Sequence, residues 1–159
     1  MSQDVNNFKT RDYSLTLSLD TNAYTSGDVL AAPQEVSLAD ANAPGGFIKG
    51  RVTSITVLDK DDQGLALDVV VMKSEVTLGT ENAAVSISDT DAEAIAGIVS
   101  VTSYIDLINS RFASALMDPV EFTVTDKSLW IGAIARGAPT HTASGIVLTL
   151  SVQFDNLGV

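Results

Sequence analysis

The residues with the clearest capacity for chemistry form the acidic run Asp59-Lys60-Asp61-Asp62-Gln63-Gly64. Acids at its first and third positions and glycine at its sixth partly match the Ca²⁺-binding loop of helix–loop–helix proteins. The twelfth position is Val70, however, where that loop needs a bidentate glutamate, and apolar runs at 55–58 and 65–72 flank the acids. We therefore interpret Asp59, Asp61 and Asp62 as part of a solvated β-hairpin turn, with a bound cation as the alternative.

The single histidine, His141, lies in the segment 137–145, which is rich in glycine, threonine and serine. A nucleophilic triad that uses histidine would depend on this residue. Its neighbours Thr140, Thr142 and Ser144 are close only in sequence, which is no evidence of a catalytic arrangement. We expect a histidine in a surface loop. With one histidine and no cysteine, the usual zinc sites are excluded.

Other residues with chemical potential form no recognisable motif. Asp118 and Glu121 are a carboxylate pair of the kind that any acidic protein offers, and Gly45-Gly46 lacks the lysine and helix of a phosphate loop. Trp130 suits a buried core position, with an interface anchor as the alternative. We expect no enzymatic activity, no cofactor and no metal site.

Composition indicates one acidic domain. The chain has 159 residues, 45% of them hydrophobic, and a formal charge of −11 from 20 acids and 9 bases. This charge repels phosphate backbones, so we expect no nucleic-acid partner. No apolar run reaches the roughly 18 residues of a membrane span, and the polar start has no signal-peptide core, so we expect no membrane partner and synthesis in the cytoplasm.

Short strands separated by polar turns are expected to position these residues. Alternation predicts a strand over 13–20, and Leu148, Leu150 and Val152 lie on the apolar face of another, over 146–154. The run 69–72 is apolar on both faces, which predicts a central strand. Further strands are predicted at 29–30 and 34–38, with an edge or bulge at Pro33, and at 47–58, 65–73, 76–78, 98–102, 111–117, 120–124 and 128–136.

One short helix interrupts this pattern. Thr90-Asp-Ala-Glu93 matches a capping box with Thr90 as N-cap, which predicts a helix over 90–97. About nine strands and one helix indicate an all-β fold, an antiparallel β-sandwich of jelly-roll type, over residues 12–159. Residues 1–11 are predicted to be a flexible arm, and we expect Lys9 and Arg11 within it to bind a partner, with a frayed terminus that has no role as the alternative.

Several blocks of the sequence resemble a family of small proteins common in tailed-bacteriophage genomes, where they are encoded near capsid genes. The resemblance covers about residues 15–150, and the blocks include Val57-Leu-Asp-Lys-Asp-Asp-Gln-Gly64, Val76-Thr-Leu-Gly-Thr-Glu-Asn82 and Ile95-Ala-Gly-Ile-Val-Ser-Val101. It implies a virion structural protein, specifically a decoration (cement) protein that binds the major capsid protein on the outer capsid surface as a homotrimer. A head–tail connector or tail component and a carbohydrate-binding β-sandwich are the alternatives.

Overall fold

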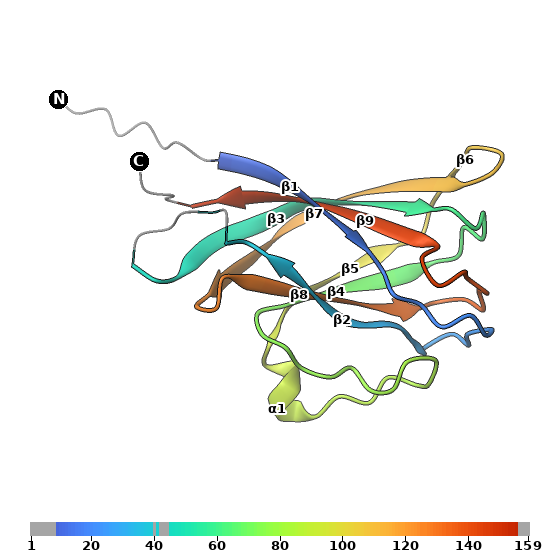
Figure 1. The fold of residues 1–159 in the computed structure, drawn as a ribbon, viewed down its shortest axis with the longest axis horizontal. Coiled ribbons are helices and arrows are strands. Elements are labelled where there is room, and N and C mark those ends of the chain that lie inside the picture. Colours follow the sequence, from blue (N-terminus) through green and yellow to red (C-terminus); the bar gives the residue numbers. More distant parts are fainter. Residues whose placement is uncertain (1–8, 40, 42–44, 156–159) are drawn as a thin grey trace.

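Two antiparallel sheets packed face to face make up the computed structural model, which describes residues 9–39, 41 and 45–155 (Figure 1). One sheet has the order β1-β9-β3-β7-β6, and the other has the order β2-β8-β4-β5. The strands of the first sheet are β1 (Lys9–Thr16), β9 (Ile146–Phe154), β3 (Ile48–Asp59), β7 (Arg111–Val124) and β6 (Ile105–Asp106). Those of the second sheet are β2 (Val29–Ser37), β8 (Ser128–Ala135), β4 (Leu67–Met72) and β5 (Ile95–Val101). The predicted all-β sandwich is confirmed.

The strand order is that of a jelly roll. Four antiparallel pairs, β1–β9, β2–β8, β3–β7 and β4–β5, are nested in the sequence, and successive pairs belong to alternate sheets. The chain therefore crosses from one sheet to the other at nearly every connection, as two interlocked Greek keys require. The short strand β6 adds one more antiparallel pair beside the start of β7.

The predicted hairpin at residues 55–72 is wrong. β3 pairs with β7 and β9, whereas β4 pairs with β5 and β8, so the turn between β3 and β4 carries the chain from one sheet to the other. An apolar pattern reports that a strand has a buried face, but it does not report which strand lies beside it. Two apolar runs around a polar turn are equally consistent with a hairpin and with a connection that crosses to the other sheet.

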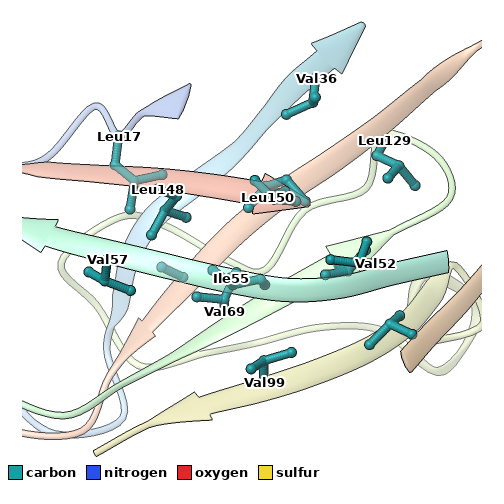
Figure 2. Close-up of a cluster of buried hydrophobic side chains, with 14 of the residues drawn as sticks. Leu17, Val36, Val52, Ile55, Val57, Val69, Val99, Leu129, Leu148 and Leu150 are labelled. Atoms are coloured by element: carbon teal, nitrogen blue, oxygen red, sulfur yellow. The ribbon is translucent and has the colours of Figure 1, made fainter. Parts of the chain in front are cut away.

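The main core lies between the two sheets and consists of the side chains that point inward from both of them. Val52, Ile55 and Val57 of β3 lie opposite Val69 and Val99 of the other sheet, and all are buried (Figure 2). The strand β9 alternates between buried and half-buried positions along its whole length, as predicted. Burial of these aliphatic side chains is the principal force that holds the two sheets together.

The prediction of a central strand covered on both faces is confirmed for β4, all six residues of which are buried. Its second face packs into a smaller cluster composed of Val29, Val70, Met72, Leu78 and Ile134. Leu78 comes from the long connection between β4 and β5, which lies on the side of the sheet away from the main core (Figure 1). The strand predicted at 76–78 is wrong, because this segment has no strand pairing.

The helix is shorter than predicted and begins earlier. α1 spans Asp89–Ala92, and Ser88 rather than Thr90 is its N-cap, since its hydroxyl accepts the Asp91 N–H at 3.0 Å. The chain enters β5 at Ile95, where β-branched residues pair with β4, so tertiary pairing ends the helix. None of the helices among the described residues is long and apolar enough to cross a membrane.

In two proline-containing stretches a single strand replaces two predicted ones, since β2 joins those predicted at 29–30 and 34–38 and β7 joins those predicted at 111–117 and 120–124. β2 runs through Pro33 as an edge strand with a register irregularity there, which confirms the predicted edge or bulge. The strands predicted at 111–117 and 120–124 are instead one strand, β7, with an irregularity near Pro119. Pro119 is tolerated because the described part of β6 pairs only with residues 111 and 112, which leaves this side of β7 open.

The prediction of a flexible arm over residues 1–11 is wrong for residues 9–11. Lys9, Thr10 and Arg11 form the start of β1 and pair with β9 at Phe154, Gln153 and Val152. The domain therefore includes Lys9. Residues 1–8 lie outside the described part of the chain.

Candidate functional site

Three of the connections at one end of the sandwich make up what we call the loop end. They are the turn at 59–66, the β6–β7 hairpin at 104–111 and the β8–β9 connection at 136–145. Strand register brings them together, because Asp59 at the end of β3 lies opposite both Arg111 and Ile146. The β1–β2 connection also lies at this end, where the Leu19 N–H donates to the Ala143 carbonyl at 3.1 Å. The start of β1 and the end of β9 lie at the opposite end of the molecule (Figure 1). Loops that a rigid sheet framework positions in this way are the usual carriers of binding sites.

Asp59 stabilises the turn from inside. Its Oδ1 accepts the Asp61 N–H at 2.9 Å and its Oδ2 accepts the Gly64 N–H at 2.7 Å, while the residue is only 2% exposed. The prediction of a solvated turn is therefore wrong for Asp59. A buried carboxylate is stable here because two backbone donors replace its water.

Asp61 fastens this turn to the β8–β9 connection. Its carboxylate accepts the Thr142 N–H at 2.8 Å and the Thr142 hydroxyl at 2.9 Å, and His141 Nδ1 lies 3.3 Å from it. His141 is 5% exposed, so the prediction of a surface histidine is wrong. Gly145 lies directly against Asp61, where a Cβ would overlap the carboxylate. The contact is a tight join between segments about 80 residues apart.

Asp59, Asp61 and His141 are the one group of potential metal ligands that the described residues bring together, with their donor atoms within 4.8 Å of one another. The third acid of the motif, Asp62, is not part of it, because its Oδ1 binds Arg111 Nε at 2.9 Å. All four oxygens of Asp59 and Asp61 already accept hydrogen bonds from this chain. These hydrogen bonds thus hold the turn at 59–66 against the β8–β9 connection.

The same contacts do not form a nucleophile–base pair. The Thr142 hydroxyl and His141 Nδ1 both contact Asp61, whereas an activated hydroxyl must contact the imidazole itself. Thr142 and His141, although neighbours in sequence, are therefore not arranged as a hydroxyl and its base.

The ionisation of Asp61 should make its contact with the β8–β9 connection sensitive to acid. Burial opposes ionisation, but hydrogen bonds from the Thr142 backbone, the Thr142 hydroxyl and His141 outweigh it and hold the pKa of Asp61 below its ordinary value of 3.8. A lowered carboxyl pKa stabilises the fold above the unfolded pKa, and this stabilisation is lost as pH falls through the folded value. Wild-type stability should therefore decline below about pH 4.

Thr142→Val tests this sign, since it removes the hydroxyl donor at nearly constant volume. We expect the variant to be less stable than wild type at pH 7, with the difference shrinking as the pH falls through the lowered pKa of Asp61, because the protonated carboxyl gains less from the donor. Urea unfolding over a series of pH values from 7 downward measures the difference. A difference that does not change with pH would contradict the assignment.

The β6–β7 hairpin presents three aliphatic side chains to solvent. Ile105 is 68% exposed, Leu107 51% and Ile108 84%, and we call these three residues the aliphatic tip. Three of the six exposed large hydrophobic residues in the described chain thus fall within four positions. Their exposure was not predicted from the sequence, although three aliphatic residues just before Asn109-Ser110 were the available signal.

The backbone of the aliphatic tip is held in an unusual conformation. Ile108 has φ of +79°, a left-handed region that β-branched residues avoid, at a cost of about 1–3 kcal/mol. Asp106 Oδ1 accepts the Ile108 N–H at 2.7 Å, and the Leu107 N–H donates to the Ser110 carbonyl at 2.8 Å. These bonds fix the turn in spite of the strain.

Arg111 and Tyr104 join the hairpin to the rest of the loop end. Arg111 binds Asp62 at 2.9 Å, lies 3.6 Å from Asp106, and packs over Gly64, where a Cβ would overlap it. Tyr104 packs against the main core, and burial together with the nearby charge of Asp59 raises its pKa. The hairpin is therefore anchored at both of its ends.

The remaining predicted residues lie elsewhere. Lys9 and Arg11 are at the opposite end, on β1, and Asp118 and Glu121 are exposed on β7. Trp130 is half-buried and packs on the smaller cluster, so it is a peripheral core residue. None of these joins the loop end.

Comparison of the chain with models of known protein families and with curated proteins gives no match.

Proposed function

We propose that this protein is a structural component of a bacteriophage particle that decorates the outer face of the capsid lattice. The observation that carries the proposal is the aliphatic tip, a fixed and solvent-exposed apolar surface held by buried polar ties at one end of a rigid sandwich. Such a surface suits binding to another macromolecule. The sequence resemblance to tailed-phage proteins supplies the identity of that macromolecule.

Fold and charge agree with this role. Jelly rolls recur in viral capsid proteins, although they also occur in lectins and cupins, so the fold supports the proposal without specifying it. A net charge of −11 favours the outer face of the capsid over the inner face, where packaged DNA would repel it. The partners are then the major capsid protein and, at three-fold positions of the lattice, two further copies of this chain as a homotrimer.

Alternative placements use the same surface differently. A head–tail connector or tail component would bind at a single vertex rather than across the lattice. A carbohydrate-binding sandwich would need an aromatic stacking platform; in the described chain Phe47 is exposed but stands alone, and Trp130 is half-buried. The capsid role therefore fits best.

The test is addition of the purified protein to capsids assembled without it. We expect saturable binding in a fixed ratio to the capsid subunits, density on the outer capsid face in a particle map, and a higher temperature of capsid disruption. Density confined to the tail vertex would favour the connector role. Capsids that bind none of the added protein would contradict the proposal.

A further inference from the structure

We propose that the aliphatic tip inserts into an aliphatic pocket of the capsid subunit, and that a basic side chain at the rim of this pocket pairs with Asp106. The inference rests on the proposed function and adds the surface and the chemistry of the contact. It makes the loop end the face that meets the capsid.

Ile108 has a backbone conformation that is unusual for its residue type. At the first central position of a two-residue turn with positive φ, glycine is the usual residue, because it has no Cβ. Here the position holds an isoleucine that is 84% exposed, so its side chain gains nothing from burial within the domain. A strained conformation that also exposes an apolar side chain is unfavourable twice in the free protein. Strain of this kind persists where the surrounding structure holds it in place, and it is concentrated at binding and active sites.

The β6–β7 hairpin is already ordered before a partner binds. Asp106, Ser110 and Arg111 fix the hairpin before any partner arrives, and Asp59 and Asp61 fix the turn beneath it. A loop that is already ordered loses little conformational entropy on binding, so more of the contact energy appears as affinity. The rigidity of the loop end is what a docking element requires.

Charge identifies the chemistry of the rim. The carboxylate of Asp106 is 60% exposed and lies 3.6 Å from Arg111, so it keeps acceptor capacity for a cation from a partner. The other acid beside the hairpin, Asp62, is also partly exposed. A complementary surface therefore combines an apolar centre with a basic rim, which also speeds encounter with a protein of charge −11.

The residues of the hairpin also disfavour the other occupants. The hairpin at 104–111 carries one acid and one base and contains no lysine or aromatic residue between 105 and 110, so it lacks the basic cluster and the aromatic anchors with which proteins attach to an anionic membrane. A second copy placed symmetrically would oppose Asp106 to itself. A hollow elsewhere on the described surface is also a poor acceptor for the aliphatic tip of a second copy. This hollow, of about 540 Å³, is lined mainly by polar and charged residues such as Lys73, Asp91 and Glu93.

The size of the tip explains why a lattice is the fitting partner. Stable interfaces usually bury about 800 Å² per partner, more than three side chains can supply. A single contact would therefore be weak. Copies joined as an oligomer on a repeating array gain avidity without any new contact, so a small tip is sufficient there.

The test compares binding and folding stability in the same variants. Ile108→Gly removes both the strain and the exposed side chain, so we expect a more stable protein that binds empty capsids at least about tenfold more weakly. Leu107→Ser should also weaken binding, with stability unchanged. Asp106→Asn should reduce the salt dependence of binding. Co-sedimentation with capsids and urea unfolding provide the two readouts.

Matched controls lie at the other end of the molecule. Phe47→Ser removes a comparably exposed apolar side chain next to β3, and Lys9→Ser removes the base that the sequence assigned to attachment. Both should bind capsids as wild type does. Equal binding by wild type and the tip variants, with Lys9→Ser weakened, would overturn the inference and leave the proposed function intact.

Three other outcomes also count against it. Failure of the wild type to bind capsids would remove the proposed function together with the inference. Tip-dependent self-association in analytical ultracentrifugation would replace the capsid with a second copy as the occupant. Tip-dependent co-sedimentation with phosphatidylcholine vesicles would replace it with a lipid surface.

Discussion

Replacing Leu78 with alanine is expected to lower the free energy of unfolding by about 2–5 kcal/mol, the usual cost of truncating a fully buried leucine. Leu78 is 1% exposed although it belongs to an irregular connection. Its side chain lies against Gly132 of β8, at a site where a Cβ on that glycine would come within 2.6 Å. It thereby fixes the connection onto the outer face of β4 and β8.

Urea unfolding followed by Trp130 fluorescence measures this loss, since Trp130 packs on the same cluster. Glu75→Ala is the matched control, because Glu75 is exposed on the same connection and should change stability by less than about 0.5 kcal/mol. If both variants unfold at the same urea concentration, the connection does not cover the sheet as described. Hydrogen exchange within residues 73–88 should quicken in Leu78→Ala alone.

The strands were predictable where burial leaves a pattern in the sequence. The alternation along β9 indicates one buried face and the apolar run at 69–72 in β4 indicates two, and both predictions are confirmed. The role of Leu78 was not predictable, because its spacing from Val76 indicated a strand at 76–78 rather than an irregular segment that covers a sheet. The partner of β3 was not predictable either, since pairing depends on how the whole chain folds over itself.

The loop end shows the same limit more sharply. Asp61 and His141 are 80 positions apart, and nothing local to either residue indicates that they meet. The acidic run itself was recognised, but its carboxylates point to different partners: Asp59 to its own turn, Asp61 to Thr142 and Asp62 to Arg111. Residue types identified the segment, and only the three-dimensional arrangement assigns each carboxylate its role.

Asp59→Ala is expected to lower the free energy of unfolding by about 2–4 kcal/mol. The substitution leaves the Asp61 and Gly64 N–H groups without their acceptor, at about 1–3 kcal/mol for each unsatisfied buried donor. The lower part of that range applies because both donors are only part-buried. Asp59→Asn keeps one acceptor oxygen and should fall between wild type and the alanine variant, as measured by urea unfolding.

Asp62→Asn is the control for charge, since it removes an acid from the same turn and asparagine tolerates the positive φ of +56° at this position. The carboxylate of Asp62 is 38% exposed in a surface ion pair with Arg111, so the loss should stay below about 1 kcal/mol. Equal losses for Asp59→Ala and Asp62→Asn would mean that the turn depends on net charge rather than on the two backbone hydrogen bonds.

The Asp59 variant also tests whether the turn supports the aliphatic tip. Tyr104 lies near Asp59, and Arg111 packs over Gly64, so a loosened turn should release both ends of the β6–β7 hairpin. Hydrogen exchange at residues 104–111 should then quicken in Asp59→Ala and stay unchanged in Leu78→Ala when both are compared under strongly native conditions. Capsid binding should weaken in the first variant only. Because Leu78→Ala loses as much global stability, this contrast separates the positioning of the tip from the stability of the domain.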